Sequence, residues 1–202
     1  MYAGVILGLG NPGPQYEHTR HNCGFDTLDF LLSCAASEGS VYAKPGSKFT
    51  CLLWDVDCPM LKGRWLVAKP LTFMNESGRC AMPLLAWHKL PPEKLIVIHD
   101  ELDIPVGEVR FKYGGGNAGH NGLKSITACL GTNNFYRLRI GIDKPRQKQT
   151  VIDWVLGRPK GEEADILART QEASLDVLES FVTKGLESAV ALARTFKPPL
   201  QD

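Results

Sequence analysis

Four polar segments of this 202-residue chain carry residue types that could do chemistry. Each follows an apolar run or precedes a segment of helical period, and together they cover residues 8–22, 72–75, 99–101 and 114–122. α/β proteins place their sites in such loops, because the carboxyl ends of parallel strands meet at one edge of the sheet. A functional site is therefore expected where these four segments converge.

His21 is the residue in these segments best suited to act on water. It directly precedes Asn22, the predicted N-cap of a helix, whose positive end disfavours a charged imidazolium. Asp100 follows a buried strand, where it can accept one ring N–H of a histidine and fix its tautomer. Asn11, Asn75 and Asn121 could donate to a carbonyl oxygen that becomes negative. These residues alone predict no more than a water-activating hydrolase, since each also has a structural interpretation as a cap, a turn residue or a surface histidine.

Other chemistries are less well supported by the motifs. Gly8-x-Gly10-x-x-Gly13 matches a dinucleotide-binding loop, but the next segment has helical period where that fold needs a second strand ending in Asp or Glu. The loop at 114–122 has five glycines and could bring backbone N–H groups close to a ligand, yet Leu123 breaks the phosphate-loop pattern. There is no nucleophile elbow. His18, His21 and Cys23 make a poor ligand set, so no metal site is predicted.

The composition is that of an ordinary globular protein, with 44% hydrophobic and 22% charged residues. The length suits one domain with a full core, and we predict a single domain over residues 1–202. No apolar run approaches the roughly 20 residues that span a bilayer, so no membrane association is predicted. The N-terminus lacks the features of a secretion signal. We therefore expect a cytoplasmic protein whose six cysteines keep free thiols.

Apolar runs alternate with segments of helical period, which predicts an α/β fold, a single domain with a mixed, mostly parallel central sheet flanked by helices. Strands are predicted at residues 5–8, 48–56, 64–68, 95–98, 106–112 and 137–142. Helices are predicted at residues 22–34, after a cap at Asn75, at 122–130, and from 161 to about 195 with a break at Gly185. Residues 55–63 are interpreted as a hairpin turn. Cys34, Cys80 and Cys129 fall in helical segments and are expected in the core.

Five sequence blocks, taken together, resemble the bacterial-type peptidyl-tRNA hydrolase family. They are GLGNPGPQYEHTRHNCGF, KPLTFMNESG, HDELDIPVG, FKYGGGNAGHNGLKSI and FYRLRIGI, in the order of that family, with VIDWVLGRP as weaker support. The resemblance implies a monomeric cytoplasmic enzyme that needs no cofactor. Its substrate would be peptidyl-tRNA, in which an ester joins an N-blocked peptide to the 3′ ribose. One departure is Asn117, which stands where some members have His and could alter contacts at the rim of the glycine loop.

The resemblance also implies roles for individual residues. His21 would be the catalytic base, Asp100 its partner, and Asn11 the residue near the scissile ester. The channel for the peptide and the tRNA 3′ end would be lined by Tyr16, Met74, Asn75 and Asn121. Lys112 and Arg139 would hold a tRNA phosphate. The alternative is a non-catalytic RNA-binding protein of the same fold, against which the complete set of His21, Asp100, Asn11 and Asn75 argues.

The net charge of +1 conceals an uneven distribution. Residues 104–160 hold ten Lys or Arg against three acids, whereas residues 161–187 hold seven acids against two Lys or Arg. Such runs are usually solvated faces. Here the basic excess includes the glycine loop and the residues of the expected phosphate contact, which favours a polyanionic partner.

Overall fold

The computed structural model describes residues 1–145 and 149–195. Within these residues, seven strands form one sheet in the order β2-β3-β4-β1-β5-β7-β6. The strands are β1 (Gly4–Gly8), β2 (Ser40–Lys44), β3 (Cys51–Cys58), β4 (Gly63–Pro70), β5 (Leu95–Glu101), β6 (Val109–Tyr113) and β7 (Tyr136–Gly141). β1 pairs in parallel with β4 and β5, and β5 in parallel with β7. β3 and β6 run against the other strands, so the sheet is mixed and mostly parallel, as predicted.

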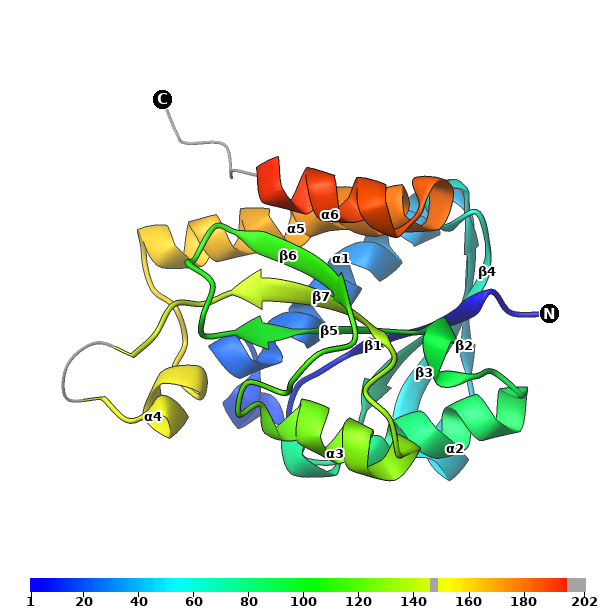
Figure 1. Ribbon diagram of the computed structural model, residues 1–202, viewed down its shortest axis with the longest axis horizontal. Coiled ribbons are helices and arrows are strands. Elements are labelled where there is room, and N and C mark those ends of the chain that lie inside the picture. The colour runs from blue at the N-terminus through cyan, green and yellow to red at the C-terminus, as the bar shows by residue number, and fades with distance from the viewer. Residues whose placement is uncertain (146–148, 196–202) are drawn as a thin grey trace.

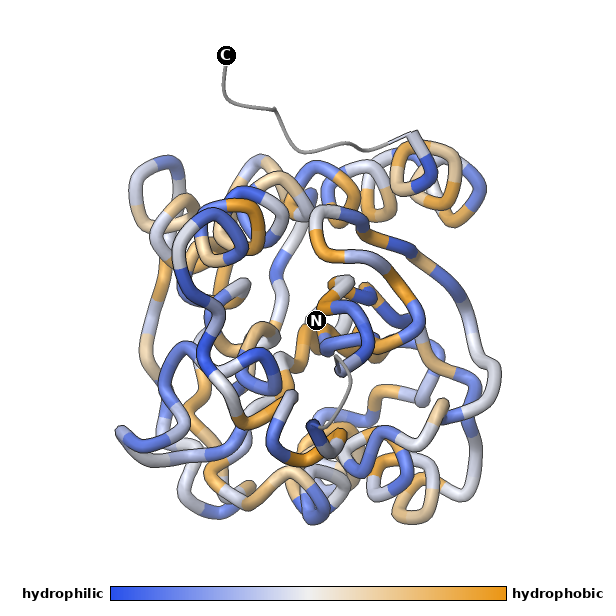
Figure 2. The backbone as a smooth tube through the Cα atoms, turned by 90° about the vertical axis from the view of Figure 1, so that its left-hand side faces the viewer, coloured by the Kyte–Doolittle hydropathy of each residue, from blue (hydrophilic) through white to orange (hydrophobic). Residues whose placement is uncertain are grey.

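Helices cover both faces of the sheet (Figure 1). One face packs against α1 (Cys23–Glu38), α5 (Glu162–Lys184) and α6 (Leu186–Thr195), with the short α4 (Val151–Val155) at its edge. The other face packs against α2 (Gly78–His88) and α3 (Asn121–Leu130). After a quarter turn the two helical layers again lie on opposite sides, and their coils mix hydrophilic and hydrophobic residues (Figure 2). Short 3-10 turns connect these elements: η1 (Pro14–Tyr16), η2 (Arg20–Asn22), η3 (Ser47–Phe49), η4 (Pro59–Leu61), η5 (Met74–Glu76) and η6 (Pro92–Lys94).

The central strands are apolar because both of their faces are buried. Along β5, Ile96 and Ile98 enter the core on the α1 side, while Leu95 and Val97 enter the core on the α2 side. Since side chains alternate along a strand, Asp100 continues the row of Ile96 and Ile98. The carboxylate at the end of β5 therefore lies on the side where α1 begins.

Several predicted boundaries change. The first two predicted strands after β1 do pair antiparallel, as β3 and β4, but residues 55–58 belong to β3 and the turn between them is η4. Neither the edge strand β2 nor the five-residue α4 was predicted. The break at Gly185 is confirmed, since α5 ends at Lys184.

The two predicted caps have different outcomes. The cap at Asn75 is wrong, because Asn75 lies inside η5 and Ser77 is the residue that precedes α2. Asn22 is the N-cap residue of α1, as predicted, although its side chain makes no hydrogen bond to that helix.

The cysteines are only partly as expected. All six carry free thiols, and Cys80 is buried. Cys34 and Cys129 are exposed, because each falls on the solvent side of its amphipathic helix.

The glycines of the first loop allow close packing between β1 and α1. A Cβ atom at Gly8 would lie 2.3 Å from the carbonyl oxygen of Gly24, and one at Gly10 would lie 2.7 Å from the ring of Phe25. These glycines thus have a structural cause that is unrelated to a dinucleotide, and β1 is followed by the two 3-10 turns η1 and η2 and then by α1.

No described helix is long and apolar enough to cross a membrane. The predicted single domain extends to residue 202, and its last seven positions lie outside the described residues.

Candidate active site

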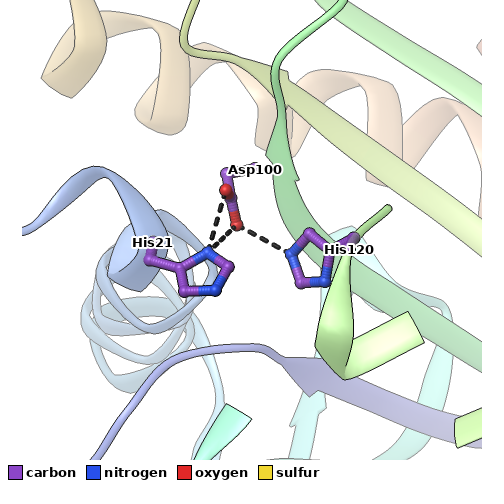
Figure 3. A group of neighbouring side chains, drawn as sticks. All are labelled: His21, Asp100 and His120. Carbon is purple, nitrogen blue, oxygen red and sulfur yellow. Dashed lines mark hydrogen bonds and ion pairs between the residues drawn. The ribbon is translucent and has the colours of Figure 1, made fainter. Parts of the chain in front are cut away.

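The end of β5 brings two histidines from opposite helical layers to one carboxylate (Figure 3). Asp100 has only 3% of its surface exposed. His21, in the turn before α1, places Nδ1 at 2.9 Å from both Oδ1 and Oδ2 of Asp100. His120, just before α3, places Nε2 at 2.8 Å from Oδ1. The rings of His21 and His120 lie 4.9 Å apart, so a single buried carboxylate organises both imidazoles.

His120 was not predicted as a site residue, and its hydrogen bonds define its tautomer. Its Nδ1 accepts the backbone N–H groups of Gly122 and Leu123 at 3.1 and 3.4 Å, which caps α3. A nitrogen that accepts carries no proton, so the proton of the neutral ring is on Nε2 and points at Asp100. Histidine is not among the residue types that typically cap a helix, and the long-range contact with Asp100 leaves no local signal either. The capping also uses N–H groups that the glycine loop was expected to offer to a ligand.

The charge of Asp100 alters the protonation of His21. Burial alone would raise the pKa of Asp100, but the two imidazoles outweigh it and hold that pKa well below its ordinary value. Burial alone would lower the pKa of His21, yet the charge of Asp100 and its hydrogen bond raise it above 6.5. The upward shift of the pKa of His21 is opposite in direction to the shift that was expected from the helix end.

Asn11 lies beyond β1 and is held from three sides. Its backbone N–H donates to Oδ1 of Asn22 at 2.9 Å, and its carbonyl accepts from Nδ2 of Asn22 at 3.0 Å. Its own Oδ1 accepts the N–H of Met74 at 2.8 Å. This leaves Nδ2 of Asn11 as a donor without a partner among the described residues. Asn22, adjacent to His21 in the chain, thus positions an amide that can donate to substrate.

A cavity of about 240 Å³ opens beside the two histidines. His21, Asp100, His120 and Asn121 line its polar side. Its apolar side consists of Leu102 and Ala118 together with Val151, Ile152 and Val155 of α4. Such a combination suits a polar reacting group with an apolar attachment.

Asn11, Tyr16, Met74 and Asn75 are not among the residues that line this cavity. Asn11 lines a neighbouring depression, which includes Asn22. Met74 is buried, and a Cβ at Gly122 would lie 2.7 Å from its sulfur, so η5 packs against the start of α3. Tyr16 meets Phe73 edge-on at 6.2 Å. Asn75 is exposed and makes no side-chain hydrogen bond within the described residues.

Lys112 and Arg139 lie on the outer strands β6 and β7. Arg139 donates twice to Oε2 of Glu101, at 3.1 and 2.9 Å, and so adjoins the residue after Asp100. Lys112 is half-buried beside Gly115, and burial together with Arg139 and Arg137 lowers its pKa. Two cationic side chains at this edge thus lie within the range of each other's charge.

Much of the basic excess of residues 104–160 serves the fold. Arg137 is fully buried and donates to the carbonyl oxygens of Gly116 and Gly115 at 2.6 and 2.8 Å, which shapes the glycine loop. Arg110, Arg139 and Lys144 form ion pairs. Arg146 and Lys148 lie outside the described residues. Among the described residues of this segment, those whose basic side chain has no partner are Lys112, Lys124 and Lys160.

Asn117, the departure in the glycine loop, accepts from Thr127 at 3.2 Å and from Arg137 at 3.5 Å. Asn117 therefore contacts residues that hold the glycine loop in place. None of its side-chain hydrogen bonds within residues 1–145 and 149–195 reaches His21 or Asp100.

The donor atoms of His21, Asp100 and His120 lie within 4.8 Å of one another, a spacing that a metal ion could use. The hydrogen bonds favour a proton network instead. Nε2 of His120 must keep its proton because Nδ1 accepts backbone N–H groups, so it offers no lone pair to a metal. That the reaction needs no metal or cofactor stays a prediction.

The sequence of residues 5–199 matches the family described as peptidyl-tRNA hydrolase. The chain belongs to the peptidyl-tRNA hydrolase family. A peptidyl-tRNA hydrolase of Desulfovibrio desulfuricans is 59% identical over 198 residues, which cover 98% of this chain and 86% of that protein. One of Nitratidesulfovibrio vulgaris is 45% identical over 97% of this chain and 98% of its own length.

The fold agrees with a solved structure of the family. The crystal structure of the peptidyl-tRNA hydrolase of Acinetobacter baumannii superimposes with a TM-score of 0.88 at 33% identity. The superposition covers 97% of this chain and 96% of that one. The predicted family and fold class are therefore confirmed.

Proposed function

We propose that this enzyme hydrolyses the ester between an N-blocked peptide and the 3′ ribose of tRNA, with His21 as general base. The observation that carries the proposal is the contact between His21 Nδ1 and Asp100, which directs the other ring nitrogen away from the carboxylate. Membership of the peptidyl-tRNA hydrolase family supports the substrate. A single domain acting as a cytoplasmic monomer completes the proposal.

The reaction follows from the hydrogen bonds. With Nδ1–H donated to Asp100, Nε2 of His21 takes a proton from water, and the oxygen of that water attacks the ester carbonyl. The carbonyl oxygen becomes negative and accepts from Nδ2 of Asn11, whose orientation the N–H of Met74 defines. When the acyl–oxygen bond breaks, the 3′ oxygen takes the proton back from Nε2. An ester leaving group is good enough for this step without a covalent intermediate.

The remaining predicted residues have supporting roles in this proposal. Tyr16, Met74, Asn75 and Asn121 contact the peptide and the 3′ end. Lys112 and Arg139 bind a phosphate of the acceptor stem. A hydrolase that serves many tRNAs has to hold phosphates and helix shape rather than base edges, and two cations at a sheet edge suit that requirement.

The test is the release of a labelled N-acetylated amino acid from tRNA in water enriched in oxygen-18. Direct attack of water on the acyl carbon predicts that oxygen-18 enters the released carboxylate and is absent from the 3′ hydroxyl. The same tRNA with a free α-amino group is the matched substrate and should react much more slowly. A protein that binds the charged tRNA but releases nothing would instead be the non-catalytic RNA-binding protein.

A further inference from the structure

Arg20, the residue before His21, is held by an unusually complete set of contacts. It is buried, with 6% of its surface exposed. Its Nε and Nη2 donate to the two carboxylate oxygens of Glu163, both at 2.7 Å, in the paired geometry of a guanidinium and a carboxylate. Its guanidinium carbon lies 3.8 Å from the ring centre of Trp154, and Nη1 donates to the carbonyl of Trp154 at 3.2 Å. One side chain thus joins the turn η2 to both α4 and α5.

Of the two helices that Arg20 contacts, α4 forms the apolar wall of the catalytic cavity. Val151, Ile152 and Val155 of α4 line the cavity opposite His21. Trp154 points the other way, onto Arg20, and its Nε1 donates to the carbonyls of Ile142 and Asp143. Figure 1 shows α4 set apart from the two main helical layers. The element it packs against most is η2.

A helix of this length has no stability of its own. Five residues make too few internal hydrogen bonds to repay the cost of nucleation, so the position of α4 depends on tertiary contacts. Val151 and Ile152 are 50% and 68% exposed and provide little packing against the body. Val155 is buried in the core, and Trp154 joins α4 to Arg20. A further anchor is the bond from the backbone N–H of Arg20 to the carbonyl of Gly157 at 3.1 Å.

We propose that Arg20 is a positioning residue that holds the apolar wall of α4 opposite His21 and thereby sets the affinity for the peptide part of the substrate. The proposal rests on the proposed function, since the peptide is what the wall would contact. Arg20 points away from the reacting atoms, toward Glu163 and Trp154. Its effect is therefore on binding, and the proton transfer at His21 is left as it is.

The planar guanidinium is what this position requires. It can stack on the indole of Trp154 and pair with two oxygens of Glu163 at once, whereas an ammonium group can do only one of these well. Arg20→Lys is thus an informative variant that keeps the charge. Glu163→Gln removes the carboxylate from the distant end of the contact and leaves η2 and α4 unaltered in sequence.

The matched control is Arg64, which forms the same paired contact with Asp55 at 3.0 and 2.6 Å on β4 and β3. Arg64→Gln removes an arginine–carboxylate pair outside the catalytic cavity. It should lower stability to some extent while leaving KM and the exchange of α4 amides unchanged. A general loss of stability would therefore be distinguished from a displaced wall.

Two measurements test the proposal. Hydrogen exchange should become faster at the amides of Trp154, Leu156 and Gly157 in Arg20→Lys and in Glu163→Gln, with no change in β5. Steady-state kinetics with N-acetylaminoacyl-tRNA should show KM raised by about tenfold with kcat within about twofold. The pH at which kcat declines on the acidic side should stay that of the parent.

Three results would overturn the proposal. They are unchanged exchange in α4, a fall in kcat without a rise in KM, and a shifted acidic limb, which would mean that Arg20 acts on His21. The exchange experiment needs no substrate. If the parent protein failed to cleave peptidyl-tRNA, the proposed function would fall, and faster exchange of α4 in both variants would still establish Arg20 as its anchor.

Discussion

His21 and His120 approach one carboxylate from opposite helical layers, and the difference lies at the second nitrogen of each ring. His21 comes from the turn before α1 and uses Nδ1 for Asp100. His120 comes from the start of α3 and uses Nε2 for Asp100, while its Nδ1 caps that helix. Among the described residues, Nε2 of His21 therefore has no protein partner, whereas both ring nitrogens of His120 are hydrogen-bonded.

The two rings show that a histidine hydrogen-bonded to a carboxylate is not for that reason a general base. A general base needs a lone pair that can reach water, and only His21 has one. His120 donates to Asp100 and so competes with His21 for its charge. A third histidine, His99, supports this arrangement, because its buried ring packs edge-on against His120 at 5.0 Å. We thus propose that His21 transfers the proton and that His120 positions Asp100.

Replacing His21 should have the largest effect. His21→Ala removes the base and should lower kcat by about 10³-fold, while binding of the tRNA persists because the phosphate contacts are intact. Release of labelled N-acetylated amino acid and a filter-binding assay measure the two quantities. His88→Ala is the matched control, since His88 lies at the end of α2 and packs against Tyr2. Turnover by His21→Ala equal to that of the parent would remove His21 from the mechanism.

Asp100→Asn should lower kcat by about 10²-fold, because the amide can no longer hold the ring of His21 in the required tautomer. It should also move the pH profile. In the parent, Asp100 raises the pKa of His21, so kcat/KM declines as the pH falls through a value above 6.5. Without that charge the effect of burial remains, and the acidic limb should move to lower pH. A limb that moved upward or stayed in place would contradict the assignment of this pKa to His21.

His120 should matter less, and two substitutions separate its contacts. His120→Asn can still accept the N–H groups at the start of α3 but loses the bond to Asp100, so kcat should fall by about tenfold with stability retained. His120→Ala loses both contacts and should in addition cost about 1 kcal/mol of unfolding free energy. Urea unfolding and single-turnover kinetics measure the two effects. A loss of kcat in His120→Asn as large as that in His21→Ala would show that His120 moves protons.

The positions of His21, Asp100 and Asn11 follow from local patterns that sequence reasoning can use. Each stands directly after a buried apolar run or before a helix of clear period, and parallel pairing of β1 with β5 then brings them together. The contact of Asn22 with Asn11 escaped prediction because the same residue also fits the pattern of a helix cap. In this case the tertiary partner prevailed over the local one.

The unpredicted elements lack a pattern for physical reasons. β2 is an edge strand with no fully buried side chain, so its residues show no alternation of apolar and polar types. α4 is shorter than two helical turns and cannot show a period. The role of His120 depends on its contact with Asp100, which lies 20 positions away in the chain. The role of Arg20 depends on its contact with Glu163, which lies 143 positions away. No local spacing encodes such contacts.

The smallest effect is expected for residues of β6 and β7, which take no part in the proposed chemistry of His21 and His120. Lys112→Ala should raise KM by about threefold, leave kcat unchanged, and reduce the slope of log KM against log salt by about one. Lys94→Ala, an exposed lysine just before β5, is the control and should change neither. Arg139→Ala should have a larger effect, because it also frees the charge of Glu101 beside Asp100. If the salt slope of Lys112→Ala equalled that of the parent, Lys112 would not contact a phosphate, and the separation between chemistry at β5 and tRNA binding at β6 and β7 would need another cation.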